Sequence, residues 1–350
     1  MNRFVDTGDG GDEYNYAPLA EERCLTASLK RVRVSHGLVR QTLELHLELD
    51  LPEKLAENRK QRSTKTVRLP LVTRASLIPG VPRLDVHTEV ENQASDHRLR
   101  VHFPAPFAAH QVNLATHDGH FEIVRRPICQ PAFDETWNEQ PRPEVPERAF
   151  TSLSNGTLGL AIANRGLPEV EALERPDGQA EIALTLLRCV GWLSRDDLPN
   201  RKGPAGPVEE TPGAQMIGKW AFDYSILPFA GPESPAVYQR AYAFVSPLRA
   251  VSAPVQAGVL PSSASFLKVE PHEFVISAVK TTEDELGWLV RGYNLSDKEI
   301  SVKLKPWRPF AQVERANLAE EKLVVLQPAE DGMVEFTARA HEIVTILFKF

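Results

Sequence analysis

The sequence predicts an all-β protein, and three observations carry that prediction. Prolines are frequent, at 28 in 350 residues, and occur along the whole length. Proline is tolerated in turns and at strand edges but disrupts helix interiors. Short runs that alternate apolar with polar residues recur, as strands with one buried face require, and turn signals such as Ile78–Gly80 and Asp331–Gly332 bound most of them. Many strands at close spacing indicate a sandwich or barrel.

The alternation is clearest in two early segments. In Leu43–Leu49 the leucines alternate with acidic residues and a histidine, and Leu84–Val90 has a similar pattern. Other strand-like runs occur along the chain at Thr66–Val72, Arg98–Phe103, Thr157–Ala163, Ala180–Leu187, Glu273–Val279, Gly287–Tyr293, Ile300–Leu304 and Val334–Ala338. The apolar run Ile343–Phe350 predicts a buried final strand. Helical periodicity is weak and confined to Glu209–Ile217 and Ala316–Leu323.

Two proline-rich stretches indicate how the chain is divided. Residues 199–212 have few apolar side chains and predict a long loop, and the strand pattern restarts after a second such stretch at 247–261. The first 24 residues are too few and too polar to form a domain. We therefore expect an N-terminal segment over 1–24, a large β domain over 25–250 and a small β domain over 251–350.

The composition excludes several classes of protein. The net charge of -7 and the pI of about 5.9 disagree with a nucleic-acid binder, which would present a basic face. No apolar run approaches the roughly 20 residues of a membrane-spanning helix, and the first residues lack the features of a signal peptide. Three widely spaced cysteines, Cys24, Cys129 and Cys189, argue against a disulfide framework and a Cys-rich zinc site. We therefore expect a cytoplasmic protein.

Four segments, taken in order, resemble the C-terminal half of glycoside hydrolase family 38, the α-mannosidase-like family. They are FVDTGDGGDEYNYAP at Phe4–Pro18, RLDVHTEVENQASDHRLRVHFPAPF at Arg83–Phe107, IALTLLRCVGWLSRDDL at Ile182–Leu198, and ETPGAQ at Glu210–Gln215, followed by Phe222–Tyr224. The amino-acid sequence of these segments resembles the bacterial branch of the family. The resemblance extends from residue 1 to about residue 245 and is weaker beyond.

The resemblance implies a fold for this chain and a separate catalytic domain. The fold would be a galactose-mutarotase-like β supersandwich followed by a smaller C-terminal β-sandwich domain. Members of the family are retaining glycosidases whose nucleophilic Asp and divalent metal, usually zinc, lie in an N-terminal α/β barrel. That barrel would precede residue 1, and residues 1–24 would lie at the junction with it. We accordingly expect no catalytic residue, metal or cofactor in this chain, which would be inactive alone and would have the barrel and an α-mannoside or related glycoside as partners.

Three motifs resemble catalytic or metal-binding patterns, and each has a simpler structural explanation. His46 and Glu48 alternate on a strand and would face solvent. A turn could bring His117 and His120 together, although polar turns of this kind are common. Ser277–Lys280 has the Ser-x-x-Lys spacing without any companion motif. The sequence therefore predicts no transition-metal site.

The acidic, glycine-rich segment Asp6–Glu13 has three interpretations. Its carboxylates belong to Asp6, Asp9, Asp12 and Glu13. They could bind calcium, although their spacing is not that of an EF-hand. Its glycines could simply permit a structural loop. The resemblance implies a third role, in which the segment reaches the mouth of the active site and Tyr14, with Asp12, contacts the sugar. A tyrosine suits this role because its ring packs on a sugar while its hydroxyl forms a hydrogen bond. Without a partner, we expect Val5–Glu13 to pack poorly.

A second candidate pair lies in the third segment. Arg188 interrupts the apolar run Leu184–Val190, and a buried charge needs a partner or a polar cavity. The resemblance links this arginine and the acidic pair, here Asp196 and Asp197, to recognition of sugar hydroxyls. The alternative is a structural salt bridge between Arg188 and one of these two acids. Trp192 is expected in the core rather than as a stacking platform.

Two other functions remain open at the level of sequence. A stand-alone mutarotase-like epimerase would need a general acid and base, for which His117 or His120 with Glu122 are candidates. A non-catalytic carbohydrate-binding module would display exposed aromatic rings, and the aromatic content of 7% does not indicate such a surface. The sequence favours the C-terminal part of a family 38 hydrolase, which braces the catalytic domain and contributes the sugar-binding residues Tyr14, Asp12, Arg188 and Asp197.

Overall fold

The computed structural model describes residues 2–20, 24–117, 123–128, 132, 134–255, 257–259 and 261–350. Apart from two 3-10 turns and the helix α1 (Pro235–Val245), the regular structure of these residues is entirely β. The predicted all-β fold is therefore confirmed. No helix of the described residues is long and apolar enough to cross a membrane. The chain divides into two compact units, and the second consists mainly of Leu248–Phe350, which contains the C-terminal strands.

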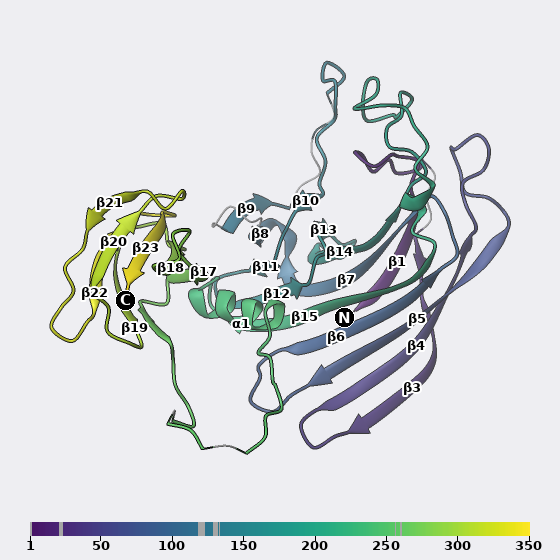
Figure 1. Cartoon of the computed structure of the whole chain (residues 1–350). Coiled ribbons are helices and arrows are strands. Elements are labelled where there is room, and N and C mark those ends of the chain that lie inside the picture. Colours follow the sequence, from purple (N-terminus) through teal and green to yellow (C-terminus); the bar gives the residue numbers. More distant parts are fainter. Residues whose placement is uncertain are drawn as a thin grey trace. The chain divides into compact units, whose positions relative to one another are not determined.

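The first unit contains two antiparallel sheets. The six-stranded sheet has the order β10-β13-β14-β7-β1-β2, and the nine-stranded sheet has the order β3-β4-β5-β6-β15-β12-β11-β8-β9. The strands of this unit are β1 (Arg3–Gly8), β2 (Leu25–Thr26), β3 (Ser28–His36), β4 (Gln41–Pro52), β5 (Thr66–Leu77), β6 (Leu84–Asn92), β7 (His97–Ala108), β8 (Asn113–His117), β9 (Ile123–Pro127), β10 (Val145–Pro146), β11 (Phe150–Ser154), β12 (Leu158–Asn164), β13 (Glu169–Glu174), β14 (Gln179–Cys189) and β15 (Gly218–Ala230). Figure 1 shows β3 to β6 and β15 as one curved layer.

One hydrophobic core joins the two sheets into a sandwich. Phe103 of β7 and Leu184 of β14 belong to the same buried cluster as Leu49, Leu69 and Ile226 of the nine-stranded sheet. The period-two alternation explains this arrangement, because successive side chains of a strand point to opposite faces of its sheet. The apolar residues of each strand therefore meet between the sheets.

The first strand is an integral part of this sandwich. β1 pairs with β7 along its whole length, from Arg3 opposite His102 to Gly8 opposite His97. Its residues from Phe4 onward are buried. The expectation that Val5–Glu13 would pack poorly is wrong, because β7 and the opposing sheet supply the contacts of the strand.

The second unit is a smaller sandwich with its own core. Its sheets have the orders β16-β19-β22 and β17-β18-β23-β20-β21. Its strands are β16 (Leu267–Glu270), β17 (Phe274–Thr281), β18 (Gly287–Asn294), β19 (Ile300–Pro306), β20 (Gln312–Ala316), β21 (Lys322–Val325), β22 (Val334–Ala338) and β23 (Ile343–Lys349). Val302, Phe336 and Phe348 belong to one buried cluster. The final run indeed forms a buried strand, β23, between β18 and β20.

The helical expectations from the sequence are wrong. Glu209–Ile217 contains only the 3-10 turn η2 (Pro212–Gln215), a second such turn being η1 (Ala109–Gln111). Ala316–Leu323 joins the end of β20 to the start of β21. The helix that forms instead, α1, begins with a proline, which is well tolerated in a first helical turn.

The core gives a direct test of the sandwich. Leu51 and Leu43 lie on the same face of β4, but Leu51 has no exposed surface whereas Leu43 is 39% exposed. We expect Leu51→Ala to lower the free energy of unfolding by about 2–5 kcal/mol, because it leaves a cavity. Leu43→Ala should cost less than about 1 kcal/mol. Urea unfolding followed by tryptophan fluorescence measures both, and equal losses would contradict this core.

Candidate functional site

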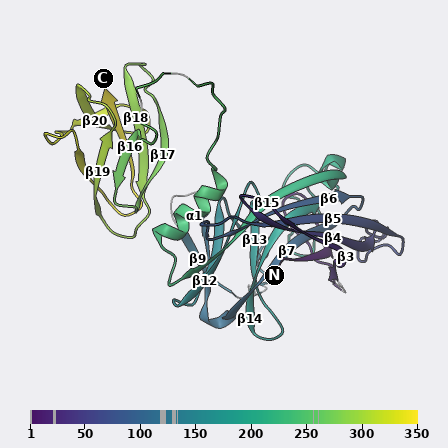
Figure 2. The ribbon, with the colours of Figure 1, turned by 90° about the horizontal axis from the view of Figure 1, so that it is seen from below.

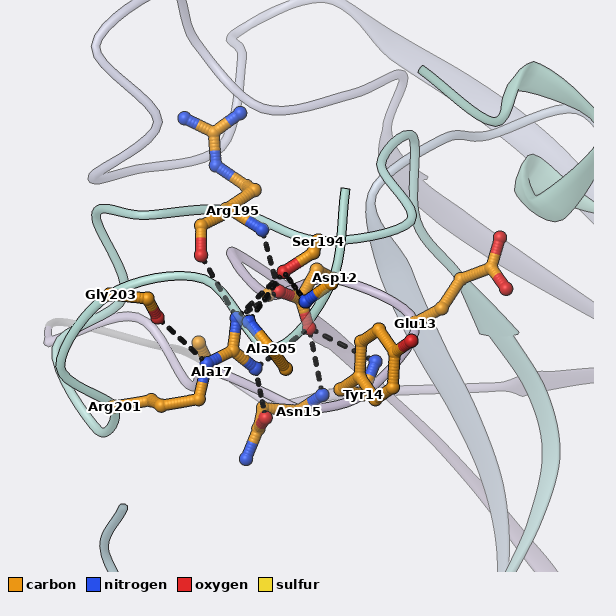
Figure 3. Close-up of polar contacts among 12 residues, drawn as sticks. Asp12, Glu13, Tyr14, Asn15, Ala17, Ser194, Arg195, Arg201, Gly203 and Ala205 are labelled. Atoms are coloured by element: carbon orange, nitrogen blue, oxygen red, sulfur yellow. Dashed lines mark hydrogen bonds and ion pairs between the residues drawn. The ribbon is translucent and has the colours of Figure 1, made fainter. Parts of the chain in front are cut away.

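The candidate site forms where the chain leaves two strands of the six-stranded sheet. β1 and β14 both pair with β7, and the last residues of both, Gly8 and Cys189, are register partners of His97. The loop that follows β1 therefore begins beside the loop that follows β14. The first, residues 9–17, is called the acidic loop below. Figure 3 shows its polar contacts with residues of the second loop.

Asp9 closes the base of the acidic loop. The carboxylate is fully buried, and its Oδ1 accepts hydrogen bonds from the backbone amides of Gly11 at 2.8 Å and Ala17 at 3.2 Å. Its Oδ2 accepts a hydrogen bond from Nε of Arg188 at 3.0 Å. Burial raises the pKa of Asp9, while Arg188 and the two amides oppose that shift. This carboxylate joins both ends of the loop to β14.

Gly11 is required by the tight turn above Asp9. A Cβ atom at this position would lie 1.9 Å from the carbonyl oxygen of Asn15 and 2.8 Å from Oδ1 of Asp9. Any larger residue would force the backbone of the loop apart. The glycine therefore serves a structural purpose, as one interpretation of the sequence proposed.

Asp12 holds the upper half of the loop. Its Oδ1 accepts hydrogen bonds from the amides of Tyr14 at 3.0 Å and Asn15 at 2.9 Å, and its Oδ2 accepts one from the amide of Arg195 at 2.8 Å. Arg201 adds an ion pair at 2.5 Å. Burial alone would raise the pKa of Asp12, but the hydrogen bonds from Arg201, Asn15 and Arg195 outweigh it and lower the pKa below its usual value.

Arg201 connects the acidic loop to the chain that follows β14. The guanidinium is buried, and besides Asp12 it donates hydrogen bonds to four groups. These are the side chains of Asn15 and Ser194 and the carbonyls of Arg195 and Gly203. No pattern in the sequence singles out this residue, because a single arginine in a proline- and glycine-rich loop resembles an ordinary surface charge.

Tyr14 and Glu13 lie exposed at the tip of the loop. The Tyr14 side chain is 46% exposed, and its ring lies against Gly206, where a Cβ atom would approach its hydroxyl oxygen to 2.9 Å. Its carbonyl accepts a hydrogen bond from Arg142 at 2.7 Å. In Figure 3 the Glu13 side chain points away from the cluster around Asp12. The loop therefore displays a phenol and a carboxylate on a fixed backbone.

The four residues predicted to contact sugar belong to this region but differ in accessibility. Arg188 is mostly buried, with bonds to Asp9 and to the carbonyls of Asp12 and Glu13. The alternative of a salt bridge from Arg188 to Asp196 or Asp197 is wrong in its partner, because Asp9 forms that salt bridge. Asp197 is exposed and pairs instead with Arg195 at 2.6 Å. The structure thus brings Asp12 and Arg188 together beneath Tyr14, whereas Asp197 lies at the surface.

The exposed Asp197 borders a pocket on another side of the acidic loop. The pocket has a volume of about 370 Å³ and is also lined by Gly10, Arg59, Lys60 and Pro199. Arg59 donates a hydrogen bond to the carbonyl of Gly10 at 3.1 Å. Trp192, expected in the core, is only half-buried, and Arg195 lies 5.1 Å from the centre of its ring.

The described residues contain no group of three or more His, Cys, Asp or Glu arranged to hold a metal. The acids of the first segment have basic partners instead, since Asp6 pairs with His97 and Arg62 in the same way that Asp9 and Asp12 pair with arginines. The calcium interpretation therefore has no support here. His120 and Glu122 lie outside the described residues, while His117 is buried.

The other two motifs have structural roles. His46 forms a hydrogen bond with Glu44 at 2.9 Å on the surface of β4. Ser277 donates to the carbonyl of Arg291 at 3.3 Å, and Lys280 forms ion pairs with acidic residues, including Glu320 at 2.7 Å. Neither arrangement joins a nucleophile to a base.

Two family models that match this chain describe the same family. The model described as "Glycosyl hydrolases family 38 C-terminal domain" matches residues 1–199, and the model of the C-terminal β-sandwich domain of the same family matches residues 273–346. A protein of Halalkalibacterium halodurans described as "Putative mannosylglycerate hydrolase" is 29% identical over 99% of this chain.

Two solved structures extend the similarity to the fold. An alpha-mannosidase from Enterococcus faecalis V583 superposes with a TM-score of 0.83 at 28% identity, and a family 38 protein from Enterococcus faecalis does so with a TM-score of 0.80 at 26% identity. Both matches cover 100% of this chain. The chain spans 38% of the first structure, 40% of the second and 38% of the Halalkalibacterium protein.

The buried Asp12–Arg201 pair makes a specific prediction. We expect Asp12→Asn to lower the free energy of unfolding by about 3–5 kcal/mol at pH 7, because it leaves a buried guanidinium without its counter-charge. Asp197→Asn, which breaks an exposed pair, should cost less than about 1 kcal/mol. Urea unfolding of the two variants measures the difference.

The pH dependence of the same variant provides the control. The lowered pKa of Asp12 means that its contribution is complete above the unfolded value of about 3.9 and is lost as the pH falls through the lower native value. The stability difference between wild type and Asp12→Asn should therefore shrink below about pH 4. A difference that stays constant down to pH 2.5 would show that Asp12 does not act as a buried anion.

Proposed function

The chain belongs to glycoside hydrolase family 38 and matches the C-terminal domains of that family; from this premise we propose that it forms the C-terminal part of a retaining, metal-dependent α-mannosidase. The catalytic domain of that enzyme lies outside these 350 residues. The length of the relatives supports the proposal, since the chain spans only 38% of the Halalkalibacterium protein and of the Enterococcus alpha-mannosidase. The fixed display of Tyr14 by the acidic loop is the observation that carries the proposed role.

The chemistry divides between the two parts of such an enzyme. A retaining glycosidase uses two carboxyl groups about 5 Å apart, one as nucleophile and one as acid and base. The described residues offer no metal cluster, and the buried acids of the acidic loop are committed to arginines. We therefore assign the nucleophile, the acid and base, and the zinc or other divalent ion to the catalytic domain.

The part played by this chain is to brace that domain and to close the sugar pocket from one side. Tyr14 supplies a ring for the apolar face of the sugar and a hydroxyl for one of its hydroxyl groups. Asp12 and Arg188 act by holding the loop in place, because Asp12 is fully buried and Arg188 is mostly buried. Asp197 is exposed and forms part of the rim. Hydrogen bonds of this kind give strong discrimination between sugars, since a wrong sugar leaves them unpaired.

The substrate class follows from the same premise. We propose an α-mannoside or a related glycoside as the substrate, in keeping with the names of the Enterococcus and Halalkalibacterium relatives. We further propose a cytoplasmic protein, in keeping with the unpaired state of Cys24 and Cys189. Neither a membrane nor a nucleic acid has a place in this function.

The test compares the isolated chain with the complete protein. The 350-residue chain should release no aryl group from an aryl α-mannoside, because the millionfold or larger enhancement of such enzymes depends on the nucleophile and the metal that we assign to the catalytic domain. In the complete protein, Tyr14→Phe should lower kcat/KM about tenfold with an unchanged melting temperature, as loss of a single hydrogen bond to the substrate predicts.

Tyr242→Phe serves as the matched control, since it removes a half-buried hydroxyl from α1 and should leave kcat/KM unchanged. Turnover by the isolated chain well above a buffer blank would overturn the division of labour. Normal kcat/KM in Tyr14→Phe would remove Tyr14 from the sugar pocket.

A further inference from the structure

Part of the apolar face of the nine-stranded sheet, on β3 and the neighbouring strands, is exposed to solvent. On β4, the inward-facing side chains change from fully buried at Leu51 to 39% exposed at Leu43. On β5 the change runs from a fully buried Leu69 to Leu77, which is 54% exposed. All four side chains lie on the same face, because Leu51 and Leu69 point into the core and alternate residues share a side. The core therefore ends before the sheet does.

β3 extends this uncovered surface to the edge of the sheet. Leu29, Val32 and Val34 are register partners of Leu47, Leu45 and Leu43, and so they lie on the inward face of the sheet. Each is about half exposed or more, with Val34 at 61%. Figures 1 and 2 both show β3 at the edge of the layer, next to β4. The term bare face is used below for the side chains of Leu29, Val32, Val34, Leu43 and Leu77.

The outward face of the same strands has the opposite character. Lys30 pairs with Glu48 at 3.4 Å, and Glu44 pairs with Arg33 at 3.8 Å and with Arg74 at 2.8 Å. Such a ladder of exposed ion pairs is typical of a surface in water. A contiguous apolar surface on the other side of the same strands is typical of an interface. The two faces therefore indicate that the bare face has a partner.

The opposing sheet shows where that partner would fit. The six-stranded sheet ends at β2, which has two residues and pairs with β1 only at Val5 and Asp6. The adjoining edge of β1, at Arg3 and Phe4, has no strand partner in the described structure. Unpaired backbone groups at a sheet edge favour the addition of another strand. A strand added there would lie opposite β3 and β4, about 10 Å away, which is the normal spacing of packed sheets.

Asn2 lies at the same place. Tyr224 of β15 donates a hydrogen bond to Oδ1 of Asn2 at 2.6 Å, and its hydroxyl also contacts Thr88 at 3.0 Å. The Thr88 hydroxyl shares a hydrogen bond with Thr73 of β5. Ala75 is the next residue on the same face of β5, and it is the register partner of Leu43 of the bare face. Asn2, the residue before β1, is therefore anchored to the sheet that carries the bare face.

We propose that the bare face is covered by a strand-forming segment of the same protein that lies outside residues 1–350 and adds to the free edge of β1. This rests on the proposed function, in which the chain is one part of a longer hydrolase. A single occupant of this kind satisfies both the apolar side chains and the open edge. A second copy of this chain, packed face against face, would cover the side chains but would leave the edge of β1 unpaired.

The test places the photo-cross-linking residue p-benzoylphenylalanine at Val34 in the protein expressed from its complete gene. Ser35 is the matched control, because it is the neighbouring exposed residue of β3 and points to the outward face. We expect cross-linked peptides from outside residues 1–350, at a yield about fivefold or more above the control, since successive side chains point to opposite faces.

Cross-links to a second copy, cross-links to residues 267–350 or equal yields at the two positions would each overturn the proposal. In the isolated 350-residue chain, Val34→Glu should lower the fluorescence of bound anilinonaphthalene sulfonate, whereas Ser35→Glu should not. Hydrolysis of an aryl α-mannoside by the cross-linking preparation tests the proposed function separately. Activity without the expected cross-link rejects this inference alone, and the cross-link without activity rejects the function alone.

Discussion

The buried ion pair between Asp12 and Arg201 is the interaction on which the candidate site depends. The Asp12 carboxylate accepts hydrogen bonds from both of the loops that follow β1 and β14, and so joins them. Its oxygens bind the amides of Tyr14 and Asn15 on one side and the amide of Arg195 on the other. Removing either partner would leave an uncompensated charge in the protein interior, which is far more costly than losing an exposed pair. The exposed tip of the loop is therefore fixed by a contact that is itself inaccessible.

Three aspartates of the first segment, including Asp12, form buried ion pairs of this kind. Asp6, Asp9 and Asp12 are all fully buried, and each meets a base from a different part of the chain. Their partners are His97 and Arg62 for Asp6, Arg188 for Asp9, and Arg201 for Asp12. Burial alone would lower the pKa of His97, but Asp6 and Cys189 outweigh it and raise the pKa to about 10. The segment is thereby tied to β7, to β14 and to the loop beyond β14.

The sequence predicted the fold well because period-two alternation is a local property. The inward leucines of β4 followed directly from it, and the buried final strand followed from a continuous apolar run, which is also a local property. It predicted the site less completely, because the partners of buried charges are set by tertiary contacts. Arg188 was recognised as a charge that needs a partner, but Asp9 lies 179 residues away in the sequence and no spacing connects the two. Arg201 gave no signal at all. The glycine-rich composition of the acidic loop suggested weak packing, whereas Gly11 in fact allows the close approach that buries the loop.

Arg201 holds the acidic loop in place, and amide hydrogen exchange measures how firmly it does so. In the wild-type chain the amides of Tyr14 and Asn15 should be protected by their bonds to Asp12. We expect Arg201→Gln to accelerate their exchange about tenfold or more, because loss of the ion pair lowers the local free energy of opening. Exchange at Val101 in β7, which lies between β1 and β14, should not change. Unaltered exchange at Tyr14 and Asn15 in this variant would contradict the account, since the loop would then be held by other contacts.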